Sequence, residues 1–355
     1  MRAALWDGND VTVVDDVDEP VAAPGQVVVA VDAAGVCGSD RSPVSGAIPQ
    51  ATPAVLGHEA SGIIASVGPG VTTPAVGERV VLTTLTPCGT CRACGKGRPT
   101  TCRAAVLNAG PRLRWRGAPA HQFVGIGAFA EYAVVEAAQA VVVPNELAAA
   151  DAALISCALV TGFGAVRNRA AVEPGEDVLV LGVGGVGAAV VHAAALAGAR
   201  VVAVDRDPSV GPMAEALGAA ELREHPDGAR LAATLDGLEV DAAFECTGVP
   251  DLVDGAMRSL AWGGRAVLVG LPPVGTSLPF QPRMLYQDKA LLGCRLGGVR
   301  PHVDIPTLAA EVLAGRIATA PFIGARRPLD AVPALLTGTE PELRSTGRVI
   351  VTPTT

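Results

Sequence analysis

The sequence is poor in aromatic residues and carries no concentrated positive charge. Only 3% of its 355 residues are Phe, Trp or Tyr, so its core has to be built mainly from Ala, Val and Leu. Asp and Glu (35) outnumber Lys and Arg (27), and the net charge is −8. No run of Lys or Arg is long enough to suggest an anionic membrane. This balance argues against nucleic acid or a membrane surface as a partner.

Signals for export and for disorder are also lacking. Residues 1–18 alternate apolar and acidic positions without a basic or apolar leader region, so we expect a cytoplasmic protein with no secretory signal. A hydrophobic content of 50% and a mean hydropathy of +0.40 argue against a disordered chain. The apolar stretch 178–204 could mimic a membrane span, but glycines, His192 and Arg200 interrupt it. It is better explained as a strand, a glycine turn, a buried helix and a second strand.

Eight cysteines stand out against only five histidines. In a chain without an export signal, clustered cysteines suggest metal thiolates before disulfides. Cys88, Cys91, Cys94 and Cys102 form a C-x₂-C-x₂-C-x₇-C array. Four thiolates in a short loop can close a tetrahedral zinc shell with no open position, as in a structural site. Two disulfides or an iron–sulfur cluster are the alternatives at this point.

The pattern along the chain predicts two domains. Up to about residue 155 it favours short strands separated by Pro/Gly turns, at residues 26–31, 60–67, 78–82 and 130–135. Continuous apolar strands then alternate with helical stretches, at residues 177–181, 201–204, 241–245 and 265–270, as is typical of a parallel sheet covered on both faces. We therefore predict an α/β protein: a mostly-β domain from residues 1–158 and 296–355, and an inserted doubly wound Rossmann domain at 159–295.

A dinucleotide-binding loop is expected where the first strand of the inserted domain ends. Gly182, Gly184 and Gly187 have G-x-G-x-x-G spacing, with Gly185 and Val186 at the start of the following helix. Such glycines allow a tight turn, a close approach to a pyrophosphate, and close packing of helix on strand. The helix N-terminus would then face the phosphates.

Asp205 ends the next predicted strand. Its carboxylate could accept hydrogen bonds from the adenosine ribose and repel a 2′-phosphate, which favours NAD over NADP. Arg206 beside it could soften that preference. The simpler alternative is that Asp205 only caps a turn before Pro208.

A second metal site is indicated by three separated residues. Cys37 follows a predicted strand, His58 precedes another, and Cys157 lies just before the inserted domain. Two thiolates and an imidazole would leave zinc a fourth position for water or substrate. Taken singly, Cys157 could be a buried small residue and His58 a core histidine.

The chain as a whole resembles a known family. The motifs C-G-S-D from Cys37, G-H-E-A-S-G from Gly57 and C-x₃-T-G from Cys157 occur in order with the cysteine array and the glycine loop. Together they resemble the zinc-dependent alcohol dehydrogenases of the medium-chain dehydrogenase/reductase family, over essentially the whole length. The resemblance implies a GroES-like catalytic domain (structural zinc lobe at 88–102), two zinc ions per chain, NAD, and a homodimer or homotetramer.

The resemblance also implies roles for individual residues. Cys37, His58 and Cys157 match the catalytic zinc ligands, and Asp40 and Glu59 match acids that orient those ligands. The other matches are Ser39, which takes the proton of the alcohol, Thr161 near the nicotinamide, Arg348 at the pyrophosphate, and a substrate pocket of Thr84, Phe123, Leu271 and Leu296. Zinc would lower the pKa of the alcohol, and the alcohol carbon would give its hydride to the nicotinamide.

Two features depart from the family pattern. Ser42 stands where many relatives carry the histidine that ends the proton relay, so the proton would leave through ribose hydroxyls and water. Residues 112–116 include Arg112, Arg114 and Arg116. This segment is either an exposed loop or a clamp for a carboxylate-bearing substrate such as a thiol–formaldehyde adduct.

Three functions are therefore in competition. The first is an alcohol dehydrogenase, and the second is a formaldehyde dehydrogenase acting on a thiol adduct. The third is a non-catalytic nucleotide-binding protein. Retention of all three predicted zinc ligands and of Ser39 argues against the third.

Overall fold

The computed structural model describes residues 1–104, 110–225, 231–278, 281–339 and 347–353, and the chain divides into two compact units. The first unit comprises Met1–Cys157, Arg300–Arg344 and Arg348–Thr355, and the second comprises Ala158–Val299 with Ser345–Gly347. The sequence had placed the two domain boundaries after residues 158 and 295.

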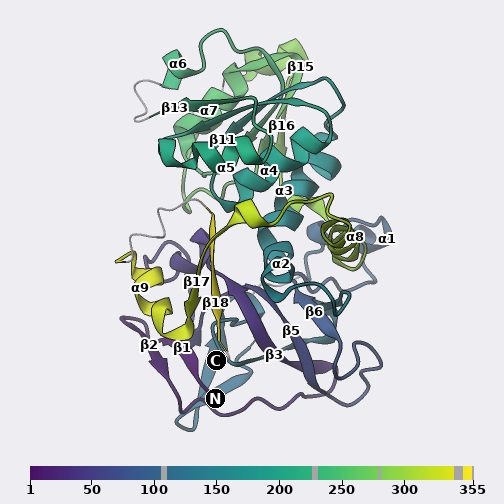
Figure 1. Ribbon diagram of the computed structural model, residues 1–355, viewed down its shortest axis with the longest axis vertical. Helices are drawn as coiled ribbons and strands as arrows, with labels where there is room; N and C mark the ends of the chain where they lie inside the picture. Colours follow the sequence, from purple (N-terminus) through teal and green to yellow (C-terminus); the bar gives the residue numbers. More distant parts are fainter. Residues whose placement is uncertain (105–109, 226–230, 279–280, 340–346, 354–355) are drawn as a thin grey trace. The chain divides into compact units, whose positions relative to one another are not determined.

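The first unit is mostly β and contains two sheets (Figure 1). One sheet has the order β2-β1-β4-β8-β7, and the other has the order β10-β6-β5-β3-β18-β17, with β9 also paired to β3. Its strands are β1 (Ala3–Trp6), β2 (Val11–Val14), β3 (Gln26–Gly35), β4 (Ala54–Val55), β5 (Glu59–Val67), β6 (Arg79–Leu82), β7 (Leu113–Trp115), β8 (Ala118–Gln122), β9 (Tyr132–Glu136), β10 (Ala140–Val142), β17 (Ile323–Pro328) and β18 (Arg348–Thr352). Its helices are α1 (Arg92–Gly95), α2 (Ala149–Leu154), α8 (Pro301–Leu313) and α9 (Val332–Thr337).

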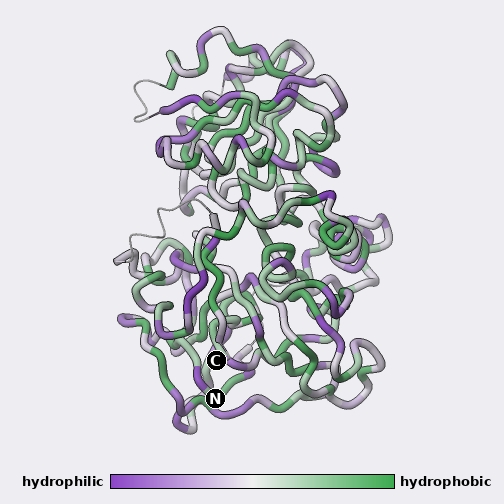
Figure 2. Tube along the Cα trace, in the orientation of Figure 1, coloured by the Kyte–Doolittle hydropathy of each residue, from purple (hydrophilic) through white to green (hydrophobic). Residues whose placement is uncertain are grey.

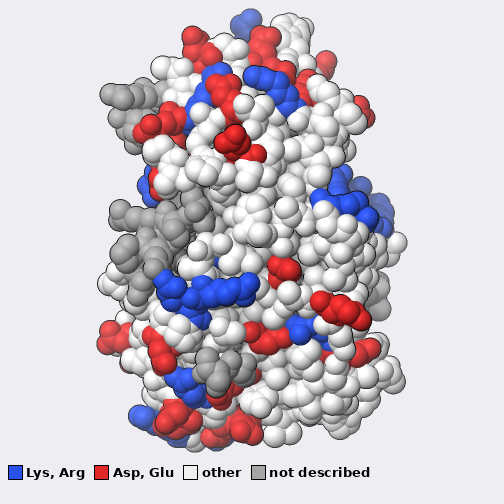
Figure 3. All heavy atoms as spheres, in the orientation of Figure 1, with Lys and Arg blue, Asp and Glu red and all other residues white. Residues whose placement is uncertain are grey.

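Val, Ala and Leu fill the core of this unit, as the scarcity of aromatic residues predicts. The inner strand β18 is buried along most of its length, whereas β17 at the edge alternates half-buried and exposed residues. Figure 2 shows β18 as hydrophobic beside a hydrophilic β17. Basic side chains lie over β17 in Figure 3, where its sequence includes Arg326 and Arg327. Charged side chains on an edge strand protect it from pairing with another chain.

The second unit is built on a six-stranded sheet in which every pairing is parallel. The strand order is β13-β12-β11-β14-β15-β16, the order of a Rossmann domain. The strands are β11 (Asp177–Leu181), β12 (Arg200–Asp205), β13 (Glu221–Glu224), β14 (Val240–Glu245), β15 (Leu260–Leu268) and β16 (Ala290–Gly293). The helices are α3 (Val160–Gly164), α4 (Gly185–Leu196), α5 (Gly211–Ala216), α6 (Leu231–Thr234) and α7 (Pro250–Arg258).

The inner strands of this sheet are buried on both faces, as their continuous apolar sequences predict. In β11 and β12, four consecutive residues of each strand are buried. Helices α4 and α5 cross the front of the sheet in Figure 1. The stretch 178–204 therefore folds as the predicted strand, turn, helix and strand.

The segment Ala149–Ala170 is the longest apolar helical stretch among the described residues. It has the length and composition of a membrane-spanning helix, but 83% of its most apolar window is buried inside the protein, as in a core helix. Its α-helical turns are interrupted by two π-helical turns, Ile155–Leu159 and Ala165–Ala170. Single π-helical turns often occur at functional sites, and the first of these contains Cys157.

Local backbone geometry alone explains why two of the three glycines in the loop after β11 are glycine. Gly182 has a φ of +87°, a conformation that residues with a Cβ rarely adopt. A Cβ on Gly187 would overlap the carbonyl oxygen of Gly182, because α4 starts directly against the end of the strand. Gly184 differs, since a Cβ there would have no atom within 4 Å.

We predict that Gly187→Ala lowers the free energy of unfolding by about 3 kcal/mol, because the new methyl group must displace backbone atoms. Gly184→Ala is the matched control and should unfold almost as the wild-type protein does. Thermal and urea unfolding, followed by circular dichroism, would compare the two. Equal stability of both variants would contradict this description of the loop.

Candidate metal centres and dinucleotide site

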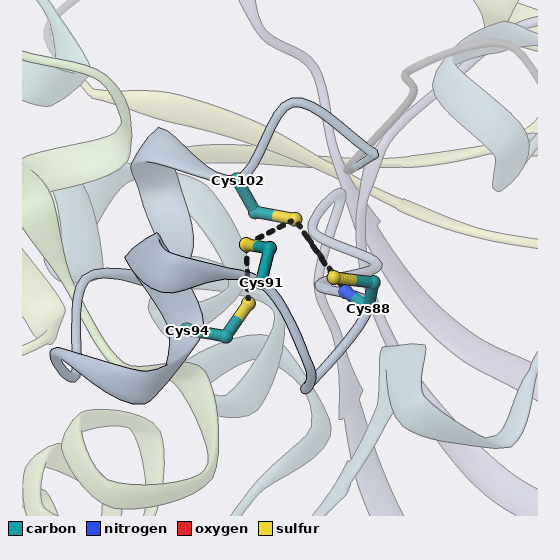
Figure 4. A group of neighbouring side chains, drawn as sticks. All are labelled: Cys88, Cys91, Cys94 and Cys102. Atoms are coloured by element: carbon teal, nitrogen blue, oxygen red, sulfur yellow. Dashed lines mark hydrogen bonds between the residues drawn. The ribbon is translucent and has the colours of Figure 1, made fainter.

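The four predicted lobe cysteines point toward one another (Figure 4). Cys91 Sγ lies 3.5 Å from Cys94 Sγ and 3.8 Å from Cys102 Sγ, and Cys102 Sγ lies 3.6 Å from Cys88 Sγ. All eight cysteines of the chain are free, so no disulfide forms among them. The disulfide alternative therefore does not hold in this structure.

The sulfur spacing fits one tetrahedral ion. A zinc ion with Zn–S bonds of about 2.3 Å requires sulfur atoms about 3.8 Å apart. An iron–sulfur cluster contains several metal atoms and would hold its cysteine sulfurs further apart. Backbone N–H groups of Thr90 and Cys91 lower the pKa of Cys88 to about 6, which favours the thiolate that a metal requires.

A second group of donors lies inside the first unit. One ligand atom from each of Cys37, His58, Glu59 and Cys157 lies within 4.8 Å of the others. Strands β3 and β5 are antiparallel with Gly35 opposite Glu59, so Cys37 just after β3 and His58 just before β5 meet at one end of the sheet. The structure thus brings together the three predicted catalytic ligands, which are separated by up to 120 residues in the sequence.

The chain turn before His58 requires glycine. Gly57 has a φ of +92°, and a Cβ there would lie 2.9 Å from the backbone nitrogen of Phe129. The backbone of Phe129 in turn donates to the carbonyl of Leu56 at 3.0 Å. This close approach fixes the position of the backbone at His58, directly before β5 begins.

Asp40 forms hydrogen bonds with two of the donor residues, His58 and Cys37. One of its carboxylate oxygens lies 2.7 Å from His58 Nδ1, and the other accepts the backbone N–H of Cys37 at 2.8 Å. Asp40 is completely buried. Because Nδ1 is engaged, Nε2 is the imidazole nitrogen left for a metal ion.

Glu59, which the resemblance implies is an acid that orients the ligands, lies in the donor group. Its Oε1 accepts a hydrogen bond from Arg348 at 2.8 Å, while its buried Oε2 has no hydrogen-bond partner among the described residues. Burial raises the pKa of Glu59 to about 7, against the opposing charge of Arg348. One carboxylate oxygen of Glu59 lies within 4.8 Å of the other three donor atoms, so Glu59 is a candidate ligand.

Arg348, predicted to reach the pyrophosphate, lies at this donor group. Its Nη2 donates to Cys37 Sγ at 3.3 Å as well as to Glu59, and the side chain is buried. A hydrogen bond from Cys157 lowers the pKa of Cys37 well below its usual value, and Arg348 acts in the same direction. The same bond and burial raise the pKa of Cys157. Buried anionic donors of this kind need a compensating cation, which a divalent metal supplies.

Other predicted site residues lie around this group or in the second unit. The ring of Phe123 packs edge-on to His58 with centroids 5.8 Å apart. Ser39 is exposed in the turn after Cys37, and Thr84 is half-buried. Leu271, which is 74% exposed, and Leu296 belong to the second unit, and their roles in a substrate pocket stay predictions.

The second unit offers a cradle for a dinucleotide. The open space at Gly184 and the N-terminus of α4 give a phosphate room and backbone N–H groups. Asp205 ends β12, and its carboxylate accepts the N–H of Val183 at 2.6 Å and that of Asp207 at 3.0 Å. It therefore ties the glycine loop to the end of β12 and also caps the turn before Pro208. Thr161 Oγ1 is buried without a partner among the described residues, which leaves it free for a ligand.

The arginines of residues 112–116 are engaged within the first unit. Arg112 pairs with Glu136 at 2.7 Å, and Arg116 pairs with Asp16 at 2.8 Å while lying over the ring of Trp115. Arg114 donates to the carbonyl of Gly117. These contacts favour a structural role over a clamp for substrate.

One buried polar residue at the donor group was not predicted. Ser156 precedes Cys157, and its hydroxyl contacts the backbone of His58, Ala60 and Leu82. The only signal in the sequence is a serine within the apolar run 152–160.

Comparison with known proteins identifies the family. Residues 23–145 match the protein-family model of the Alcohol dehydrogenase GroES-like domain, and residues 185–314 match the family model of the Zinc-binding dehydrogenase. The S-(hydroxymethyl)glutathione dehydrogenase of Synechocystis sp. is 32% identical over 314 residues, which cover 84% of this chain and 85% of that protein. The chain therefore belongs to the zinc-dependent alcohol dehydrogenases of the medium-chain dehydrogenase/reductase family. It is an oxidoreductase that uses zinc and a nicotinamide cofactor.

Solved structures agree with this assignment. The benzyl alcohol dehydrogenase of Acinetobacter calcoaceticus superposes with a TM-score of 0.89 at 28% identity, over 99% of both chains. A zinc-binding dehydrogenase of Sinorhizobium meliloti 1021 bound to NADP superposes with a TM-score of 0.82 at 29% identity, also over 99% of both chains.

We predict that Asp40→Asn weakens metal binding at the buried donor group by about 10–100-fold, the usual effect of removing a residue that orients a ligand. Asn has one acceptor oxygen in place of two. Its NH₂ group would therefore replace an acceptor, and lose a hydrogen bond, at either the N–H of Cys37 or His58 Nδ1. Zinc retention against a chelator is the measurement, with the four-cysteine lobe as an internal reference. Asp7→Asn, which changes an exposed acceptor of two backbone N–H groups, is the matched control. Zinc retention in Asp40→Asn equal to that of the control would contradict the role given to Asp40.

Proposed function

We propose that this chain transfers a hydride between an alcohol and NAD, giving an aldehyde or ketone and NADH. The observation that carries the proposal is the donor group of Cys37, His58, Glu59 and Cys157 in the first unit, in which Cys157 is half-buried and the other three are buried. Two thiols, an imidazole and a carboxylate suit zinc. Because two thiols and an imidazole can leave zinc an open position, we infer that this group is the reactive centre.

Zinc held by Cys37, His58 and Cys157 would supply Lewis acidity, which lowers the pKa of an alcohol hydroxyl toward neutrality. Asp40 keeps the imidazole and the Cys37 backbone in place, and Arg348 offsets the charge of Cys37 and Glu59. We assign a second zinc to Cys88, Cys91, Cys94 and Cys102, whose closed shell leaves no position for a substrate.

Proton transfer is assigned to Ser39. Its exposed position, two residues after Cys37, suits a hydroxyl that meets an incoming alcohol. Ser42 cannot act as a base, so we infer that the proton leaves through ribose hydroxyls and water. Phe123 adds an apolar wall beside His58, which favours an uncharged substrate.

We assign NAD as the preferred cofactor on the charge of Asp205. A carboxylate at the end of β12 favours ribose hydroxyls and disfavours a 2′-phosphate. The exposed Arg206 acts against this preference. The zinc-binding dehydrogenase of Sinorhizobium meliloti 1021, whose structure is similar to this chain, was solved bound to NADP. Both cofactors therefore belong in the test.

We further propose a homodimer or homotetramer and a cytoplasmic location. Strand β16 lies at the edge of its sheet, and the segment before it exposes Val274 and Tyr286, which are 89% and 87% accessible. Open strand edges and exposed apolar side chains favour association with a second copy. Eight free cysteines suit a reducing compartment. Nucleic acid and membranes are not proposed as partners.

A thiol–formaldehyde adduct is the second candidate substrate. It is favoured by the relative from Synechocystis sp., which is named for S-(hydroxymethyl)glutathione. Against it stand the ion pairs that occupy Arg112 and Arg116.

The function is tested by NADH absorbance during oxidation of primary, secondary, aromatic and polyol alcohols and of thiol–formaldehyde adducts, each with NAD and NADP. We expect turnover of an uncharged alcohol that prefers NAD and stops when a chelator removes zinc. No turnover by protein that has bound zinc and cofactor would instead favour a non-catalytic binding protein.

The same assay separates the two substrates. Arg114→Ala and Arg116→Ala should leave the kinetics on thiol adducts unchanged if these arginines are structural. A rise in KM for carboxylate-bearing adducts, with the kinetics on neutral alcohols unaffected, would support the clamp.

A further inference from the structure

The hydroxyl of Ser156 connects the segments that carry three of the four buried donors. Ser156 is 2% exposed and immediately precedes Cys157 in the π-helical turn Ile155–Leu159. Its Oγ accepts the backbone N–H of Ala60 at 3.2 Å and donates to the carbonyl of Leu82 at 2.6 Å. The carbonyl of His58, at 3.4 Å, is a weaker second acceptor for the same proton.

The register of the sheet shows what this hydroxyl replaces. Strands β5 and β6 are antiparallel, with Ser61 opposite Val81 and Gly62 opposite Val80. The same register continued by one residue sets Ala60 opposite Leu82, yet the pairing stops at Ser61. The N–H of Ala60 and the carbonyl of Leu82 are both taken by Ser156 Oγ. The side chain thus closes the end of the ladder in place of a direct contact between the strands.

We propose that Ser156 is a positioning residue for the catalytic metal group. It ties the strand end that carries His58 and Glu59 to the helical turn that carries Cys157, and so sets the spacing of the donors. This inference rests on the proposed role of that group as a zinc site.

A hydroxyl suits this position because it donates and accepts at one atom. Alanine can do neither, so Ser156→Ala leaves the N–H of Ala60 and the carbonyl of Leu82 without this partner. Ala60 lies two residues after His58, and Leu82 lies on the neighbouring strand β6. Ser156 itself is followed directly by Cys157. Loss of the hydroxyl therefore changes the relative positions of the donors rather than their chemical identity.

Ser61 provides a matched control on the same strand. It is completely buried, and its hydroxyl can donate to the carbonyl of Ala149 in the helical segment at 2.9 Å or to Asp32 on β3 at 2.8 Å. Neither of these hydrogen bonds involves His58 or the turn of Cys157. Ser61→Ala should cost stability through the same kind of lost hydrogen bond but leave the donor group unchanged.

The experiment compares full-length wild type, Ser156→Ala, Ser156→Thr and Ser61→Ala. The first readout is zinc affinity of the catalytic group by chelator competition, with the zinc of the four-cysteine lobe as reference. The second is the thiolate-to-cobalt absorption after exchange of that zinc for Co²⁺, which reports ligand geometry without any substrate. Thermal unfolding records the stability of each variant.

We expect Ser156→Ala to lose about 10–100-fold in zinc affinity and to change the cobalt spectrum. Ser61→Ala and Ser156→Thr, which keeps the hydroxyl, should retain both. An unaltered spectrum and affinity in Ser156→Ala would overturn the proposal, as would an equal loss in Ser156→Thr, since volume would then be the cause. Failure of the wild type to bind zinc at this group would instead overturn the proposed function.

Discussion

One electrostatic requirement shapes the first unit: the thiols of Cys37 (buried) and Cys157 (half-buried) and two buried carboxylates lie together at the end of a sheet, and their charge has to be balanced. Arg348 supplies one fixed positive charge, and Asp40 orients the imidazole of His58. The buried Oε2 of Glu59 has no hydrogen-bond partner among the described residues. A divalent cation at the proposed zinc site would add the positive charge that the thiols and carboxylates require.

The second unit depends on a different constraint, which is close approach of backbone atoms. Gly187 lets α4 start against the end of β11, and Gly162 lets α3 pack on α4, where a Cβ would lie 2.5 Å from the side chain of Ala189. Asp205 then joins the glycine loop to the next strand. The cradle for a dinucleotide is therefore set by small residues and one carboxylate, while charge balance governs the metal site.

Much of this arrangement could be predicted from the sequence. The strand at Asp177–Leu181, the glycine loop and the cysteine array follow from local spacing and hydrophobic pattern, and their geometry agrees with that pattern. The contact of Arg348 with Cys37 spans 311 positions, and no local pattern reports it. The place of Glu59 depends on its contact with Arg348, which comes from a distant part of the sequence, and the bridging role of Ser156 depends on the register of β5 and β6. Both are properties of tertiary packing.

Hydride transfer, as proposed, depends on a metal ion held by the donor group of Cys37, His58 and Cys157. The most direct measurement is the zinc content of the purified chain, followed together with dehydrogenase activity while a chelator removes the metal stepwise. We expect two zinc ions per chain, with activity lost in proportion to the zinc of the Cys37–His58–Cys157 group and restored when zinc is returned. Full activity after that zinc has gone, or a single zinc held only by the four-cysteine lobe in active protein, would contradict it.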